Sequence, residues 1–116
     1  VFGTPGGDAQ DQWTLQFFLN YVDFGMNLQE ALDAATVHSV HFPSSFYPRV
    51  GYPGRVITES RIPAGVTNEL AQKGHEVVST GGWSNGKVMG IRYDKARVVI
   101  MGAVSPKGNI GYAIGW

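Results

Sequence analysis

A proline followed by two glycines near the start of the chain constrains the fold more than any other local feature. An apolar, strand-like segment over residues 1–3 precedes them, and an amphipathic segment begins at about residue 9. Proline fixes φ and glycine accepts positive φ, so Thr4-Pro5-Gly6-Gly7-Asp8 is typical of a tight turn. The sequence therefore predicts a strand that turns sharply into a helix, with Asp8 as the N-cap of that helix.

The amphipathic segment predicts a helix over residues 9–23. Asp11 lies in its first turn, where a carboxylate favours the helix N-terminus, and Gly25 follows its end. Asn27 with Glu30 forms a capping-box signature, which predicts a second, short helix over residues 28–34. Apolar residues at helical spacing predict a broad apolar face on the first helix: Trp13, Leu15, Phe17, Phe18 and Val22.

The rest of the chain alternates strand-like and helical segments. The proline-rich stretch at residues 41–48 cannot form a regular helix. A short polar joint at residues 94–96 predicts that the last two strands form an antiparallel hairpin. The whole pattern predicts an α+β fold, antiparallel strands with helices on one face. The predicted elements are strands over residues 55–59, 75–79, 87–93 and 97–104, a helix over 63–73 and a closing apolar segment over 111–116.

Composition excludes several classes of function. Nine Lys and Arg balance nine Asp and Glu, so the chain lacks the clustered cations that nucleic-acid binding requires. No stretch approaches the roughly 20 apolar residues that span a bilayer, so no membrane partner is expected. Without cysteine there is no disulfide and no thiolate. The chain has 116 residues and starts at Val1 on a strand, which indicates that residues 1–116 are a single partial domain.

The glycine turn is the strongest candidate for chemistry. Adjacent glycines let the backbone approach a ligand, and the N–H groups of Gly6 and Gly7 would suit a carboxylate or a developing oxyanion. The alternative is a plain strand-to-helix turn with a capping Asp8. No Gly-Lys-Ser/Thr follows the turn, so it is not a P-loop.

Histidines and serines add no complete catalytic set. His38 and His41 lie three residues apart, but no acidic third ligand lies near them, so packed or hydrogen-bonded histidines are expected, with no metal or cofactor. His75 follows a predicted helix end and is expected to interact with the C-terminus of that helix. No serine lies in a Gly-x-Ser-x-Gly elbow. Ser44 and Ser45 are expected in a loop that caps itself.

Taken in order, several blocks of the sequence resemble the γ-glutamyltransferase family over nearly the whole chain. Residues 3–10 (Gly-Thr-Pro-Gly-Gly-Asp-Ala-Gln) are similar to its Gly-Ser/Thr-Pro-Gly-Gly turn and the start of the following helix. Residues 74–77 (Gly-His-Glu-Val) resemble its Gly-His/Gln-x-Val segment. Residues 102–107 (Gly-Ala-Val-Ser-Pro-Lys) and 111–113 (Gly-Tyr-Ala) resemble its closing Gly-Ala-x-Asp/Ser-Pro-Arg and Gly-x-Ala segments.

The resemblance implies part of an N-terminal-nucleophile hydrolase, an αββα sandwich, in the C-terminal part of the small catalytic subunit. The precursor would cut itself, and a new N-terminal Thr upstream of Val1 would attack a γ-glutamyl amide such as glutathione. Gly6 and Gly7 match the glycine pair whose N–H groups hold the oxyanion. Pro5 and Asp8 lie beside that pair as candidate substrate-binding residues. No cofactor is implied.

The implied partners are upstream large- and small-subunit segments of the same precursor and a small-molecule γ-glutamyl substrate. The isolated chain is therefore expected to be inactive and to self-associate through exposed sheet edges. Two alternatives stay open: a related acylase acting on β-lactam side chains or other N-acyl amides, and a non-catalytic module that kept the fold. Cytoplasmic and periplasmic or secreted locations are both open.

Overall fold

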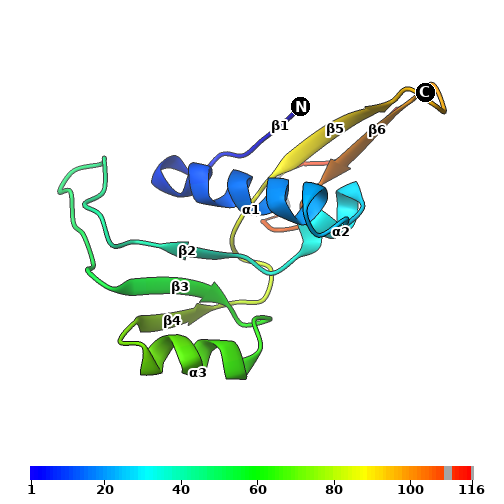
Figure 1. Ribbon diagram of the computed structural model, residues 1–116. Coiled ribbons are helices and arrows are strands. Elements are labelled where there is room, and N and C mark those ends of the chain that lie inside the picture. Colours follow the sequence, from blue (N-terminus) through cyan, green and yellow to red (C-terminus); the bar gives the residue numbers. More distant parts are fainter. Residues whose placement is uncertain (109–110, 116) are drawn as a thin grey trace. The chain divides into compact units, whose positions relative to one another are not determined.

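The computed structural model describes residues 1–108 and 111–115 and divides into two compact units (Figure 1). Unit 1 comprises residues 1–34 and 86–116, and unit 2 comprises residues 35–85. Trp116, the end of the predicted closing segment, lies outside the described residues. Among the residues described, no helix combines the length and apolar character needed to cross a membrane. That the chain is part of a single domain stays a prediction.

Unit 1 is a three-stranded antiparallel sheet with helices on one face (Figure 1). Its elements are β1 (Phe2–Gly3), the 3-10 helix η1 (Gly7–Ala9), α1 (Gln10–Val22), α2 (Leu28–Asp33), β5 (Met89–Asp94) and β6 (Val99–Val104). The strand order is β1-β5-β6, with Gly90 paired to Phe2 on one side and to Ala103 on the other. The sheet therefore brings the first residues of the chain against its last strands.

Small residues in the sheet let the helices of unit 1 come close. A Cβ atom at Gly90 would lie 3.3 Å from Leu28 Cδ1 and 3.4 Å from Phe17 Cζ, so the missing side chain sets the distance between sheet and helices. Burying each large apolar side chain here contributes about 1.5–3 kcal/mol. The core consists of Trp13, Phe17, Ala31, Leu32, Val88 and Ala103.

Only part of the predicted apolar face of α1 is buried. Trp13 and Phe17 are 9% and 4% exposed, as the helical spacing predicted. Leu15, Phe18 and Val22, which belong to the same predicted apolar face, are 56%, 44% and 53% exposed. The reason is geometric, because the sheet and α2 cover one side of α1 and the apolar residues extend beyond that side.

The predicted cap is absent at the start of the first helix of unit 1 and present at the start of α2. Asp8 lies inside η1 and not at the N-cap of a longer helix, since Gly6 and Ala9 hold the N-cap positions and neither start has a side-chain cap hydrogen bond. α2 begins with the predicted capping box. Asn27 Oδ1 accepts the N–H groups of Gln29 and Glu30 at 3.0 Å, and Glu30 Oε2 accepts the Asn27 N–H at 2.9 Å.

The predicted hairpin is confirmed, with a longer turn than the sequence indicated. Strands β5 and β6 pair antiparallel from Met89 opposite Val104 to Asp94 opposite Val99. Asp94 Oδ1 accepts the N–H groups of Ala96 and Arg97 at 3.1 and 3.2 Å. Val98 has a φ of 55°. The side-chain bonds and this left-handed residue keep residues 97–98 in the turn, so β6 starts two residues later than predicted.

Unit 2 is a mixed three-stranded sheet flanked by one helix (Figure 1). Its elements are β2 (Val37–Ser39), β3 (Arg55–Glu59), α3 (Ala64–Gln72) and β4 (Glu76–Thr80), in the strand order β2-β3-β4. β2, which the sequence did not predict, pairs antiparallel with β3. β3 and β4 pair in parallel, because α3 returns the chain to the starting end of the sheet.

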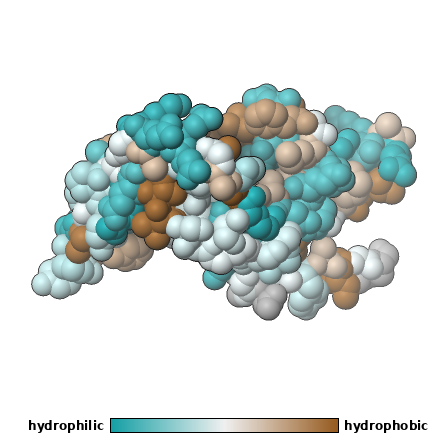
Figure 2. All heavy atoms as spheres, turned by 90° about the horizontal axis from the view of Figure 1, so that it is seen from below, coloured by the Kyte–Doolittle hydropathy of each residue, from teal (hydrophilic) through white to brown (hydrophobic). Residues whose placement is uncertain are grey.

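Apolar side chains are exposed in both units, and Figure 2 shows several such groups in brown among polar ones. In unit 2 they lie in the loop before β3, where Phe42 and Tyr47 are 82% and 94% exposed. The same loop closes on itself as predicted, since Ser44 Oγ accepts the Phe46 N–H at 3.1 Å. In unit 1, Ile91, Tyr93 and Ile100 are exposed, on the sheet face opposite the helices by the alternation of the strands.

Candidate functional site

The predicted site residues lie together in the turn that joins β1 to α1. Gly6 has a φ of 141° and Gly7 a φ of 56°, so both occupy conformations that favour glycine. Pro5, Gly6, Gly7 and Asp8 are all exposed. The structure thus places the four residues in one short, accessible stretch of backbone at the surface of unit 1.

The N–H groups of the glycine pair are available to a ligand. Within the described part of the chain, neither Gly6 nor Gly7 donates its N–H to a protein acceptor, whereas the Gly6 carbonyl accepts the Ala9 N–H at 3.3 Å. Gly6 is the N-cap of η1 and Gly7 is its first residue, positions at which backbone N–H groups have no acceptor within the helix. Two such adjacent donors can hold a carboxylate or an oxyanion, which is the chemistry that the sequence predicted for them.

Two side chains of α1, those of Trp13 and Gln10, contact the turn between β1 and α1. A Cβ atom at Gly6 would clash with Trp13 Cζ3 and lie 3.0–3.1 Å from Cε3 and Cη2, so the indole fills the space beside the Gly6 Cα. Gln10 Nε2 donates to the Thr4 carbonyl at 2.6 Å. The helical spacing places Trp13 on the apolar face of α1, but its spacing of seven residues from Gly6 gives no signal of this contact.

Thr4 does not act as a free hydroxyl in this turn. Its Oγ1 donates to the Pro5 carbonyl at 2.7 Å, which fixes the hydroxyl along the backbone. The turn therefore supplies donors for an oxyanion without supplying the atom that would attack. A complete acyl-transfer site needs a nucleophile and a base beyond these residues.

The three histidines are partly buried or contact backbone groups. His38 lies in β2, and burial lowers the pKa of its imidazole. His41 Nδ1 accepts the Gly54 N–H at 3.0 Å. His75 meets the end of α3 through its backbone, whose N–H donates to Leu70 O at 3.1 Å, while its ring Nδ1 lies 3.3 Å from Gly54 O. Among the described residues, no three His, Asp or Glu side chains gather as a metal site.

Unit 2 contains a buried carboxylate that the sequence pattern did not predict. Glu59, at the end of β3, is 0% exposed and lies 2.6 Å from Arg61 Nη2. Its Oε1 accepts the N–H groups of Ser84 and Asn85, each at 3.1 Å. The Arg61 guanidinium in turn lies 3.6 Å from the ring centre of Trp83. Glu59 therefore fastens residues 83–85 to the end of β3, and an alternating strand pattern could not reveal this because Glu is rarely buried.

A buried lysine holds the C-terminal part of unit 1. Lys107 is 0% exposed, and its Nζ donates to the Ala34 carbonyl at 2.6 Å. Its backbone N–H donates to Ser105 Oγ at 3.3 Å, and Ser105 is also buried. This Ser-Pro-Lys block is one of those that carried the resemblance, and its contacts give it a structural role in joining the end of β6 to the end of α2.

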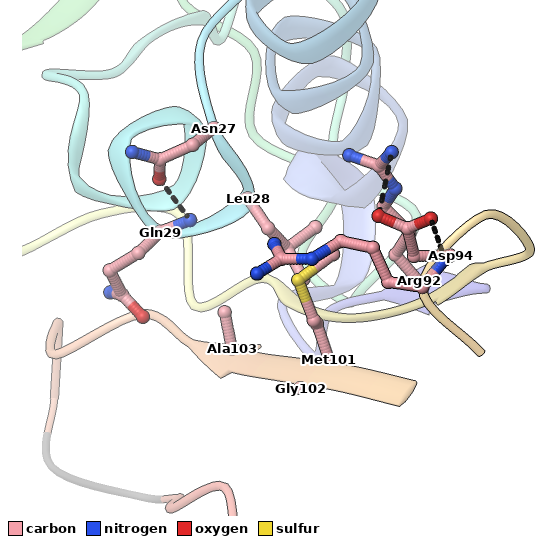
Figure 3. A pocket seen from close by; sticks show the side chains of 9 residues that line it. Asn27, Leu28, Gln29, Arg92, Asp94, Met101, Gly102 and Ala103 are labelled. Carbon is pink, nitrogen blue, oxygen red and sulfur yellow. Dashed lines mark hydrogen bonds and ion pairs between the residues drawn. The ribbon is translucent and has the colours of Figure 1, made fainter. Parts of the chain in front are cut away.

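A hollow of about 550 Å³ lies between the start of α2 and the β5–β6 hairpin. Figure 3 shows Asn27 and Gln29 at one end, Arg92 and Asp94 at the other, and Met101–Ala103 along the strand below. Arg92 Nη2 lies 3.8 Å from Asp94 Oδ2. None of the predicted site residues lines this hollow. An apolar groove of about 310 Å³ between β1, α1 and β5 likewise contains none of them.

The family described as gamma-glutamyltranspeptidase matches the chain over residues 1–116. The glutathione hydrolase proenzyme of Pseudomonas sp. (strain A14) is 51% identical over 45 residues, which are 39% of this chain and 8% of that protein. The match over the whole chain agrees with the resemblance carried by the glycine turn and the closing segments.

Solved structures resemble the whole chain. The structure of LmbA2991HD has a TM-score of 0.92 and 44% identity, covering 99% of this chain and 21% of that chain. A cephalosporin acylase from Bacillus halodurans has a TM-score of 0.72 and 28% identity, covering 91% and 18%. Gamma-glutamyltranspeptidase from Pseudomonas nitroreducens complexed with L-DON, at 24% identity and a TM-score of 0.73, covers 99% and 55% and shows a likeness of fold.

These findings define the fold as part of the αββα sandwich of N-terminal-nucleophile hydrolases, as predicted. The chain belongs to the γ-glutamyltranspeptidase family. It spans about a fifth of the length of the solved relative LmbA2991HD (21%) and matches 8% of the curated one.

Proposed function

We propose that the whole protein hydrolyses or transfers a γ-glutamyl amide of the glutathione type, and that this chain supplies the oxyanion-binding glycines. The observation that carries the proposal is the exposed Gly6–Gly7 turn, whose two N–H groups donate to no protein acceptor in the described part of the chain. Family membership supports the reaction class.

The proposed reaction begins at a Thr that becomes N-terminal when the precursor is cut, upstream of Val1. Its hydroxyl oxygen forms a bond to the γ-carbonyl carbon, and its α-amine accepts the hydroxyl proton. The carbonyl oxygen becomes an oxyanion, which the N–H groups of Gly6 and Gly7 stabilise. Collapse breaks the C–N bond, the leaving amine takes the proton, and water or an acceptor amine then resolves the acyl-enzyme.

The same proposal gives Pro5 and Asp8 their roles. Pro5 fixes the backbone direction into the glycine pair, because its ring restricts φ. The Asp8 carboxylate lies directly after the pair and is proposed to contact the acyl group of the substrate. The partners of the chain are the remaining large- and small-subunit segments of the precursor, so this chain alone is proposed to be inactive.

A specific observation favours a second candidate, an N-acyl amide acylase of the β-lactam side-chain type. The cephalosporin acylase from Bacillus halodurans is 28% identical and resembles 91% of this chain. Both candidate reactions use the same glycine turn and the same acyl-enzyme route. They differ in the acyl group, so only a comparison of substrates separates them.

The test uses the full natural gene product, with the 116-residue chain as its control. Release of the coloured amine is followed from a γ-glutamyl anilide and from an N-acyl anilide that lacks the amino acid head group. Turnover of the γ-glutamyl compound by the full product supports the first candidate, and preference for the other compound supports the acylase. A self-cleaved product that turns over neither compound would overturn both, and would favour the non-catalytic module.

A further inference from the structure

We propose that Trp13 and Gln10 are positioning residues for the oxyanion-binding turn, an inference that rests on the proposed function of Gly6 and Gly7. Both side chains come from the first half of α1, and both contact the turn and not the substrate-facing N–H groups. The helix would then hold the turn in its active conformation as well as filling the core.

The first contact is the indole of Trp13 against Gly6. Three atoms of its six-membered ring, Cζ3, Cε3 and Cη2, occupy the space that a Cβ at Gly6 would need. Trp13 is itself only 9% exposed and is packed in the core with Phe17 and Ala31. Because core side chains hold the Trp13 ring in place, the ring prevents Gly6 from moving toward the core. The contact therefore maintains the Gly6 φ of 141°.

The second contact is the carboxamide of Gln10 against Thr4. Gln10 Nε2 donates to the Thr4 carbonyl at 2.6 Å, so it bridges the residue before Pro5 and the first turn of α1. The Ala9 N–H donates to the Gly6 carbonyl at 3.3 Å within the same loop. The Trp13 ring thus contacts the glycine pair on the core side, and the Gln10–Thr4 hydrogen bond links the two ends of the turn. The N–H groups of the pair stay free for a ligand.

The test compares paired substitutions in the full gene product. Trp13→Phe removes the second ring of the indole. Phe17→Leu is its control, because Phe17 is also buried on the same helix but has none of the atoms nearest to a Cβ at Gly6, which all belong to Trp13. Gln10→Leu removes the bridge, and Gln16→Leu is its control because Gln16 Nε2 donates within the helix, to Gln12 O at 2.9 Å. Gln10 is exposed, so its variant tests the proposal even where the Trp13 variant folds poorly.

Two readouts are measured, the steady-state constants and the hydrogen exchange of the Ala9 amide. The proposal predicts that Trp13→Phe and Gln10→Leu lower kcat at least about tenfold with little change in KM, because a small misplacement of a catalytic group costs that much or more. Their Ala9 amides exchange faster than in the wild type. The Phe17 and Gln16 variants keep the wild-type kcat and exchange rate, even where Phe17→Leu lowers the melting temperature as much as Trp13→Phe does.

The two readouts separate failure of this inference from failure of the proposed function. If the wild type turns over neither substrate, the proposed function is wrong, and the exchange rates still decide whether these side chains hold the turn. Equal kcat losses in the Trp13 and Phe17 variants, or unchanged Ala9 exchange in both the Trp13 and Gln10 variants, would overturn the positioning role.

Discussion

At the scale of single residues, the two glycines of the turn carry different constraints. For Gly7→Ala the expected cost is that of a left-handed backbone, about 1–2 kcal/mol, since Gly7 has a φ of 56°. Gly6→Ala has a strained φ and also clashes with Trp13, so it is expected to lower the free energy of unfolding by more. Urea unfolding of the full gene product measures both. A smaller loss for Gly6→Ala than for Gly7→Ala would contradict the geometry.

Asp8 is predicted to set the acyl group that the site accepts. Replacing it by Ser removes a carboxylate next to the Gly6–Gly7 pair while keeping a short polar side chain. We expect the ratio of kcat/KM for the γ-glutamyl anilide over the N-acyl anilide to change at least about tenfold, as a lost charged hydrogen bond would cause. Asp11→Ser, in the first turn of α1, is the control and should leave this ratio unchanged.

His38 is predicted to make stability fall in acid. Burial lowers the pKa of its imidazole below the ordinary value of 6.5, so the folded protein keeps His38 neutral where the unfolded chain already binds a proton. The stabilisation is present above pH 6.5 and is lost as pH falls from there toward the folded pKa. Melting temperatures between about pH 5 and 8 measure it. His38→Gln should flatten this dependence, and an unchanged slope would refute the assignment.

At the scale of elements, the buried contacts of Glu59 are predicted to be the strongest polar link in unit 2. Glu59→Gln removes the charge that faces Arg61 Nη2 at 2.6 Å and weakens the acceptor for two backbone N–H groups. Breaking a fully buried pair costs about 3–5 kcal/mol, and we expect a loss near the lower end because the Arg61 side chain is 27% exposed. The control is Glu76→Gln, whose pairing with Arg55 is exposed and contributes about 0–1 kcal/mol. Equal losses in urea unfolding would contradict the account.

Elements specified by neighbouring residues could be predicted from the sequence, and elements specified by distant contacts could not. The Asn27–Glu30 capping box and the β5–β6 hairpin depend on residues close in the chain, and both are confirmed. β2 has three residues beside a proline-rich loop and depends on its pairing with β3, so it was missed. The parallel pairing of β3 and β4 differs from the antiparallel expectation, because it depends on how α3 returns the chain to the sheet.

The candidate site likewise has one part that could be predicted from the sequence and one part that could not. The glycine turn could be found because Pro5, Gly6 and Gly7 have conformational preferences of their own. The contact of Trp13 with Gly6 could not be predicted, because it depends on the position of α1 relative to the turn. Asp8 was wrongly expected to cap a helix because a local rule for N-caps cannot foresee that η1 begins before it.

At the scale of the whole molecule, the exposed sheet face of unit 1 predicts self-association of the isolated chain. Ile91, Tyr93 and Ile100 are 56%, 55% and 74% exposed and belong to the paired strands β5 and β6. In an αββα sandwich such a face packs against a second sheet. Sedimentation should show dimers or larger species for the 116-residue chain, and Ile91→Lys with Ile100→Lys should reduce them. A monomeric wild-type chain would contradict this expectation.

We propose that the chain contributes oxyanion donors to an acyl-transfer site whose nucleophile lies elsewhere in the full protein. The most direct measurement is amine release from a γ-glutamyl anilide by the full gene product, by its Gly6→Ala variant and by the isolated chain. We predict turnover by the full product and none by the chain alone. In the variant we predict a kcat lower by about 10²–10³, because the clash of the new Cβ with Trp13 moves the donor N–H groups out of position. Turnover by the isolated chain, or an unchanged kcat in a folded, self-cleaved Gly6→Ala variant, would contradict the account.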